Sequence, residues 1–117
     1  MYTLLERIKI RLRQFEMNGS EVVFTKLNEN IILEELIDKA KKDIADYRHY
    51  PDSYTPEKID EDISNNYSAL LIDLVLYDYS TEGADFESSH SENGVNRTYI
   101  SRNSILGKVI PFVKILV

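Results

Sequence analysis

The chain has 117 residues, of which 43% are hydrophobic and 29% charged, with a net charge of −6 at pH 7 and no cysteine. This size and composition predict one globular domain, residues 1–117, with a single modest core. The lack of cysteine excludes disulfides, thiolate metal sites and a thiol nucleophile, and the negative charge disfavours tight binding of nucleic acid.

The first predicted element is a short amphipathic helix over residues 2–14. Its apolar side chains share one side, with Leu4, Leu5, Ile8 and Leu12. The other side carries Arg7, Lys9 and Arg11. Asn18-Gly19-Ser20 is a turn signal, and Val22-Val23-Phe24 suits either a short strand or an extended linker.

A second helix is predicted over residues 28–48, with Asn28 or Asn30 as its N-cap. Its apolar face comprises Leu33, Leu36, Ile37, Ala40, Ile44 and Tyr47. Arg48 and His49 complement the dipole at its C-terminus, and Pro51 ends the helical region.

The third predicted helix spans residues 56–80 and is the longest. Thr55-Pro56-Glu57 supplies a hydroxyl cap, a proline at the first position and an acid in the first turn. The principal apolar stripe comprises Ile59, Ile63, Tyr67, Leu70, Leu74 and Tyr77. Leu71, Ile72, Val75 and Leu76 widen it. A helix that is apolar nearly all round is buried on several sides, so we expect it at the centre of the fold.

The last third of the chain is less regular. Gly83 is a plausible helix C-cap, and residues 82–94 are polar and predicted to form a loop. Residues 95–101 suit a strand or hairpin arm, and residues 101–107 suit one helical turn. With Gly107 and Pro111, the arm and tail over residues 95–117 are predicted to be largely extended. The predicted fold is therefore mainly all-α: a small helical bundle around a long central helix, with a short β-strand or hairpin and an extended C-terminal tail.

The tail is the most unusual segment, because residues 109–117 are nearly all apolar. Either the chain's own core or a neighbouring chain must cover it. Charge is also segregated: residues 59–96 hold nine acids and no Lys or Arg, whereas residues 97–117 hold four basic residues and no acid. These opposite charges meet either inside one monomer or between adjacent copies, and complementary faces on one subunit generate a ring when the rotation closes.

Nothing in the sequence indicates an enzyme. There is no nucleophile elbow, phosphate-binding loop, dinucleotide-binding glycine pattern or zinc-protease motif. Glu87, His90 and Glu92 can be drawn as a metal site, but a solvated polar loop is the simpler interpretation. We therefore expect no catalytic residue, no cofactor and no metal. No apolar run approaches the roughly 18 residues of a membrane span, and no signal peptide is evident.

A series of short sequence motifs occurs in a fixed order through most of the chain, from about residue 28 to residue 116. Leu4-Leu5-Glu6-Arg7 precedes them. They are Asp46-Tyr47-Arg48-His49-Tyr50-Pro51, Tyr54-Thr55-Pro56-Glu57, Leu74-Val75-Leu76-Tyr77-Asp78-Tyr79, Glu82-Gly83-Ala84, Ser89-His90-Ser91-Glu92-Asn93-Gly94, Arg97-Thr98-Tyr99, Ser104-Ile105 and Pro111-Phe112-Val113-Lys114. In order and spacing the chain resembles the head–tail connector (adaptor, or head completion) proteins of tailed bacteriophages, particularly those of low-GC Gram-positive hosts.

The resemblance implies a structural virion protein at the head–tail interface, assembled in the host cytoplasm. Such subunits form a ring on the portal protein, commonly of twelve copies, and are often monomeric alone. The ring extends the DNA channel and gives stopper or tail-completion proteins an attachment surface. DNA passes through the lumen without sequence-specific binding, which an acidic lumen favours.

The resemblance also implies which residues face the portal, and the residue types suggest which ones lie between subunits. The portal-facing candidates are Ile105, Val109, Ile110, Pro111, Phe112, Val113 and Leu116. Candidates for contacts between subunits are Arg97, Tyr99, Arg102, Tyr77 and Tyr79, since tyrosine suits interfaces that are apolar in bulk and hydrogen-bonded at the edge. The alternative is a small regulatory or antitoxin-like interaction module, in which the apolar tail folds into a partner protein.

Overall fold

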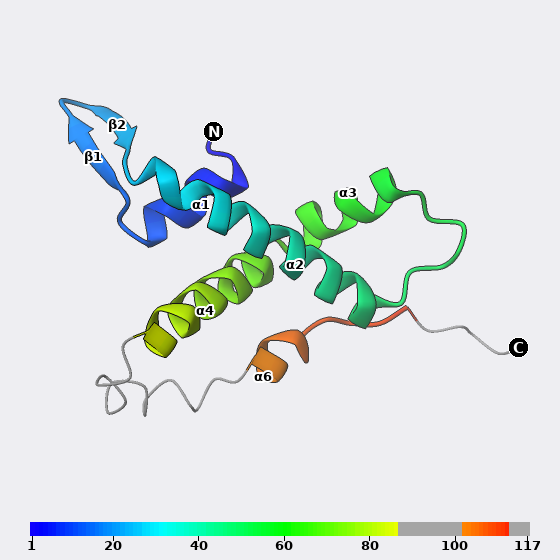
Figure 1. Ribbon diagram of the computed structural model, residues 1–117. Coiled ribbons are helices and arrows are strands. Elements are labelled where there is room, and N and C mark those ends of the chain that lie inside the picture. Colours follow the sequence, from blue (N-terminus) through cyan, green and yellow to red (C-terminus); the bar gives the residue numbers. More distant parts are fainter. Residues whose placement is uncertain (87–101, 113–117) are drawn as a thin grey trace, which may run out of the picture.

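The computed structural model describes residues 1–86 and 102–112, and it is mostly helical with one small antiparallel hairpin (Figure 1). The predicted fold class is thereby confirmed. In chain order the elements are α1 (Leu4–Arg11), β1 (Phe15–Asn18), β2 (Glu21–Phe24), the 3-10 turn η1 (Leu27–Glu29), α2 (Asn30–Arg48), α3 (Pro56–Asn66), α4 (Ser68–Phe86) and α6 (Arg102–Leu106). None of these helices is long and apolar enough to cross a membrane.

Helix α1 begins with a capping box. The Glu6 amide donates to Thr3 Oγ1 at 3.2 Å, and the Thr3 amide donates to Glu6 Oε1 at 2.8 Å, so two otherwise unpaired amides are satisfied. The helix ends at Arg11, earlier than residue 14, because the chain turns into the hairpin through Arg13 at φ 60°.

The segment Val22-Val23-Phe24 is a strand rather than a linker. It belongs to β2, which pairs with β1 so that Phe24 lies opposite Phe15 and Glu21 opposite Asn18. Gly19, at φ 65°, makes the turn predicted from the sequence. The hairpin projects from one end of the helical body (Figure 1).

Helix α2 matches the predicted span, but its predicted cap is wrong. The N-cap is Glu29, and no side chain caps this end. The Asn30 amide oxygen instead accepts a hydrogen bond from Lys9 Nζ at 2.6 Å, so tertiary structure takes the group that the local pattern assigned to capping. At the other end His49 adopts the left-handed conformation at φ 55° and closes the helix.

The predicted helix over residues 56–80 is two helices. Tyr67, at φ −129° and ψ 16°, separates α3 from α4. Asn65 and Asn66 just before it are weak helix formers, which is the local signal for the break. The break lets α3 and α4 run in different directions, so that both pack against α2 (Figure 1).

The end of α4 also differs from expectation. The helix continues to Phe86, so Gly83 lies inside it and residues 82–86 of the predicted loop are helical. An interior glycine costs about 1 kcal/mol, which the remainder of a long, well-packed helix can offset. The predicted helical turn near residues 101–107 is confirmed as α6, and the predicted strand over residues 95–101 lies outside the described residues.

The core surrounds α4, which contacts α1, α2, α3 and α6. Its buried apolar side chains are Ile8, Leu33, Leu36, Ile37, Ala40, Ile44, Ile63, Leu71, Ile72, Leu74, Val75, Ile105, Leu106 and Val109. The predicted faces of the second and third helices supply most of them. Tyr47, assigned to the same face as Ile44, is an exception because it is 40% exposed.

Lys9 was predicted on the solvent side of α1 and is instead 1% exposed. Its ammonium donates to Gln14 Oε1 at 3.0 Å, to the Lys26 carbonyl at 3.2 Å and to Asn30 Oδ1 at 2.6 Å. Burial lowers the pKa of Lys9, and the nearby charge of Glu29 opposes this shift. All three donor positions are used, so the buried charge ties α1, the hairpin and the start of α2 together.

Replacing Leu74 with alanine should lower the free energy of unfolding by about 2–5 kcal/mol, because it leaves a cavity beside α4. Urea denaturation followed by circular dichroism measures the change. The matched control is Ile31→Ala on α2, where the side chain is 73% exposed and the loss should stay below about 0.5 kcal/mol. Equal losses in the two variants would contradict the placement of the core.

Candidate partner-binding site at the C-terminal segment

The chain's own core covers the first part of the apolar C-terminal segment. Ile105 and Val109 are 6% and 5% exposed and pack with the helices around α4. Ile110 is 68% exposed, Pro111 is exposed and Phe112 is partly buried. Within the described residues, the segment therefore leaves the core at Val109 and crosses the surface over Ile110 to Phe112.

Backbone hydrogen bonds fix this crossing against the end of α2. The Phe112 amide donates to the Arg48 carbonyl at 2.7 Å, and Arg48 Nη1 donates to the Ile110 carbonyl. The Ile110 amide donates to the Tyr67 hydroxyl at 3.2 Å. Three groups of an otherwise irregular segment are thus paired without a sheet or a helix.

Aromatic rings enclose the Phe112 side chain. Its ring centroid lies 5.5 Å from that of Tyr50 and 5.3 Å from that of Tyr54, and the Arg48 guanidinium carbon lies 3.9 Å above the Phe112 ring. The same guanidinium is 5.4 Å from the Tyr67 ring. We call Arg48, Tyr50, Tyr54 and Tyr67 the Arg48 clamp. Its stacking and cation–π contacts are each worth on the order of 1 kcal/mol.

Asp62 on α3 forms hydrogen bonds to two members of the clamp, Arg48 and Tyr50. Its Oδ2 is 3.2 Å from Arg48 Nε and accepts from the Tyr50 hydroxyl at 2.6 Å, while Oδ1 accepts from Asn66 Nδ2 at 2.7 Å. Burial alone would raise the pKa of Asp62, but the hydrogen bonds from Tyr50, Asn66 and Arg48 outweigh it and lower that pKa. Burial, together with the hydrogen bond to Asp62, raises the pKa of Tyr50.

The local sequence explains why these groups converge. Arg48 is the last residue of α2, and the left-handed His49 reverses the chain direction directly after it. The turn closed by the Tyr54 amide and the Pro51 carbonyl, at 2.9 Å, places the Tyr50 and Tyr54 rings 5.4 Å apart. Thr55 then caps α3, which carries Asp62.

The sequence-predicted partner residues are distributed between core, surface and undescribed segments. Of the portal-facing candidates, Ile105 and Val109 are core residues, Ile110 and Pro111 are exposed, Phe112 fills the clamp, and Val113 and Leu116 lie outside the described residues.

Three of the residues proposed to lie between subunits, Arg102, Tyr77 and Tyr79, are described in the structure. All three interact with their own chain. Arg102 lies 2.6 Å from Asp43 and 2.8 Å from Asp78, so part of the segregated charge meets inside one monomer. Tyr79 donates to Glu29 at 2.7 Å, and Tyr77 packs partly buried against the core. Arg97 and Tyr99 lie outside the described residues.

Sequence reasoning missed the clamp. Arg48 was assigned to the helix dipole alone, and the tyrosines were assigned to interfaces in general. The density of aromatic residues around one arginine, in Tyr47-Arg48-His49-Tyr50, was the available signal. Sequence reasoning lacked the partner, because Phe112 is far away along the chain.

The charged groups of the site, Arg48 and Asp62, pair with each other. No cluster of three His, Asp or Glu side chains within residues 1–86 and 102–112 could hold a metal ion. The residues Glu87, His90 and Glu92 lie outside those ranges. The fold and this site define a small helical protein in which residues 110–112 are held against the surface of the helices.

Comparison with known proteins gives the family. Residues 21–106 match the family model described as phage gp6-like head-tail connector protein, and because this covers most of the chain, the chain belongs to that family. It is thus a structural component of a phage virion, from a family that is in general not enzymatic. No curated protein and no solved structure matched the chain.

Replacing Arg48 with lysine should loosen the Ile110–Phe112 crossing, because an ammonium cannot both stack on Phe112 and reach two acceptors. We expect a loss of about 1–3 kcal/mol in unfolding free energy and faster hydrogen exchange at the Phe112 amide, measured by NMR. Arg11→Lys, at an exposed position of α1, is the control and should change neither quantity. Unchanged exchange at Phe112 in Arg48→Lys would contradict the clamp.

Acid should also weaken the clamp. The folded-state pKa of Asp62 lies below its ordinary value of 3.8, so its stabilisation is complete above that value and is lost as pH falls through the folded-state pKa. Unfolding free energies measured in urea from pH 6 down to about pH 2.5 should therefore fall less steeply below pH 4 in Asp62→Asn than in the unchanged protein. Parallel curves for the two proteins would show that Asp62 is not the responsible group.

Proposed function

We propose that the protein docks as a ring on the portal protein, extends the DNA channel and presents the attachment surface for stopper or tail-completion proteins. The family assignment supports this role. The single observation that carries the assignment of a docking site is the Ile110–Phe112 crossing. There, the Arg48 clamp and its hydrogen bonds hold an apolar segment at the surface.

We further propose which of the portal-facing candidates touch the portal. Because Ile105 and Val109 are buried in the subunit, they anchor the segment and leave contact with the portal to their neighbours. Ile110 is the strongest contact residue, since neither the core nor the clamp covers it. Pro111 keeps the backbone extended beside it. Val113 and Leu116 follow in the sequence and remain part of the proposal.

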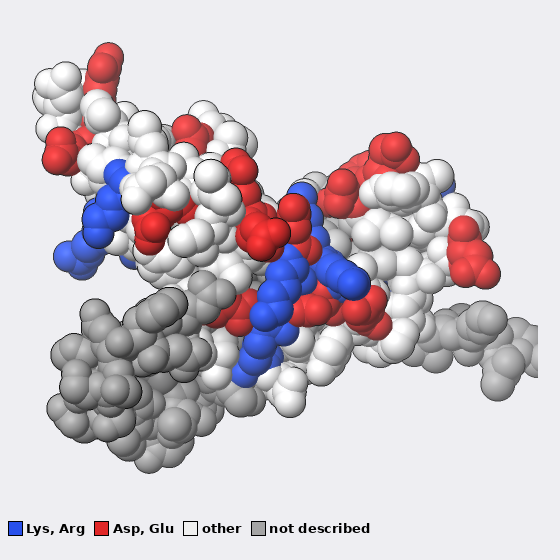
Figure 2. Space-filling view, in the orientation of Figure 1, with Lys and Arg blue, Asp and Glu red and all other residues white. Residues whose placement is uncertain are grey.

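Electrostatics favour a conduit through which DNA passes without adhering. The net charge is −6, and acidic side chains are spread along the face shown in Figure 2, from the hairpin to α3, with basic side chains gathered mainly between them. A ring of twelve such subunits would repel phosphates from its lumen wherever the acids line it. We expect assembly in the host cytoplasm and a final location at the head–tail interface of the virion.

Mixing the purified protein with its cognate portal rings tests the proposal. The portal should capture the protein, and electron microscopy should show an added ring. Ile110→Asp should reduce capture by roughly tenfold or more, because it places a charge at the centre of an apolar contact. Ile31→Asp is the matched control, since Ile31 is equally exposed on α2 but remote from the C-terminal segment. Failure of the unchanged protein to bind portal rings would refute the proposed function.

A further inference from the structure

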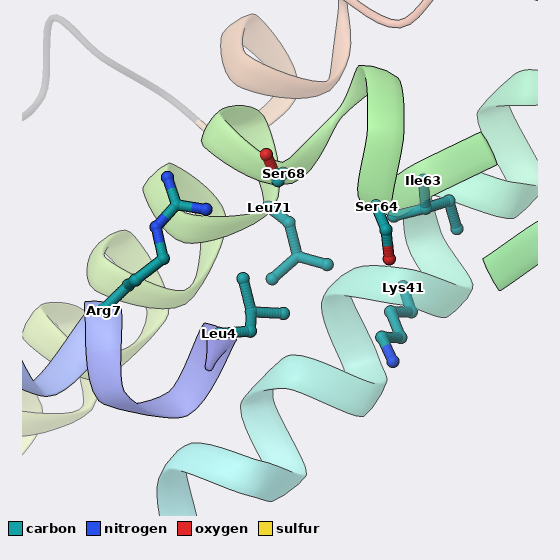
Figure 3. A pocket seen from close by; sticks show the side chains of 7 residues that line it. All are labelled: Leu4, Arg7, Lys41, Ile63, Ser64, Ser68 and Leu71. Carbon is teal, nitrogen blue, oxygen red and sulfur yellow. The ribbon is translucent and has the colours of Figure 1, made fainter. Parts of the chain in front are cut away.

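A pocket lies between α1, α2, α3 and α4, and none of the residues that line it belongs to the Arg48 clamp (Figure 3). Its volume is about 170 Å³. The lining residues are Leu4, Arg7, Lys41, Ile63, Ser64, Ser68 and Leu71. In the close view, Leu4 and Leu71 lie between Arg7 on one side and Lys41 on the other. The pocket therefore has an apolar centre, Leu4 and Leu71, between two basic residues, and Ser64 and Ser68 also line it.

The polar groups of this pocket are unused within the described part of the chain. There, neither Arg7 nor Lys41 makes an ion pair or a side-chain hydrogen bond, although Lys41 is partly buried. The hydroxyls of Ser64 and Ser68 likewise have no partner among those residues. Two cations that flank an apolar floor fit a ligand with two carboxylates and an apolar group between them.

The chain itself has a surface with two carboxylates and an apolar side chain. On the hairpin, side chains alternate between two faces, and the outer face consists of Glu16, Asn18, Glu21 and Val23. All four are exposed, and Val23 is 46% exposed. Glu16 and Glu21 are diagonal neighbours across the two strands, which places their Cβ atoms roughly 7–8 Å apart. Neither carboxylate has a partner in the described residues.

We propose that the pocket receives the outer face of the hairpin of a second copy, with Val23 against Leu4 and Leu71 and the two carboxylates beside Arg7 and Lys41. The hairpin cannot reach its own pocket, because it follows the C-terminal end of α1 and projects away from the helices, whereas Leu4 begins α1 (Figure 1). Complementary surfaces that cannot meet within one chain make head-to-tail contacts. The inference rests on the ring that the proposed function includes, and it does not require that the ring docks on the portal.

The hairpin is anchored well enough to serve as a rigid insert. An isolated two-stranded hairpin is marginally stable in water. Here the Thr25 amide donates to the Gln14 carbonyl at 2.9 Å, and the Tyr2 and Phe24 rings meet edge to face at 6.0 Å. The buried Lys9 holds Gln14 and the Lys26 carbonyl on either side of the hairpin base. Less conformational entropy is lost when a fixed insert docks.

Cross-linking tests the contact directly, because the chain has no cysteine of its own. The variant Val23→Cys/Ser64→Cys, treated with a short bis-maleimide, should give a ladder of dimers, trimers and larger species on a denaturing gel. Each single-cysteine variant is a control and should give no species larger than a dimer. The reaction is run on concentrated protein and on protein captured by portal rings.

Charge reversal provides the second measurement. Arg7→Glu, Lys41→Glu, Glu16→Lys and Glu21→Lys should each weaken self-association by roughly threefold to tenfold in sedimentation velocity or native mass spectrometry. The variant with all four reversals should recover association. Arg11→Glu, at an exposed cation of α1 outside the pocket, is the matched control and should have little effect.

The outcomes separate this inference from the proposed function. If portal rings capture the protein but no ladder forms and the hairpin variants assemble normally, the inference is wrong and the proposed function stands. If only the pocket variants weaken assembly, the pocket takes a carboxylate from another protein, which also overturns the inference. A ladder together with recovery in the fourfold reversal supports it, whether or not portal binding is found.

Discussion

The burial of α4 is the constraint on which the rest of the structure depends. Leu71, Ile72, Leu74 and Val75 follow one another around this helix, and none is more than 3% exposed. A helix that is apolar nearly all round needs neighbours on several sides, and α1, α2, α3 and α6 provide them. Because α6 is one of these neighbours, the C-terminal part of the chain becomes part of the subunit's own core. Its path from Val109 onward then begins at a fixed point beside the end of α2.

Arg48 links that core to the Ile110–Phe112 crossing, where docking on the portal is proposed. Its side chain contacts Asp62, Phe112 and the Ile110 carbonyl at once, which only a planar guanidinium with several donors can do. A partly buried arginine of this kind is tolerable because a carboxylate and a carbonyl satisfy it, and Asp62 is in turn satisfied by Tyr50 and Asn66. The clamp and Asp62 thus form a connected polar network beside the exposed Ile110, and this network fixes the position of the Ile110 backbone.

The N-terminal elements are joined to the family region by different chemistry. The match to head-tail connector proteins begins at residue 21, so α1 and β1 precede it. Lys9 crosses this boundary, because its ammonium bonds to Gln14 before the match and to Lys26 and Asn30 within it. The network extends from Gln14 through the Tyr79 hydroxyl to Glu29, so α4 is included. A hairpin fixed in this way offers its outer face in one orientation, which is the property that an ordered assembly needs.

The sequence by itself determined the helical class, the core faces of α2 and α4, the turn at Gly19 and the helix start at Thr55, because each of these follows from local spacing or local hydrogen bonding. The order and spacing of its short motifs also revealed the family resemblance. Tertiary structure decided the burial of Lys9, the role of Asn30 as an acceptor and the clamp on Phe112. In each of these cases the deciding partner lies far away along the chain, so no local pattern contains it. The apolar tail shows the division most plainly: its composition demanded a cover, and only the packing of α6 and Val109 against α4 showed that the subunit supplies the first part of that cover.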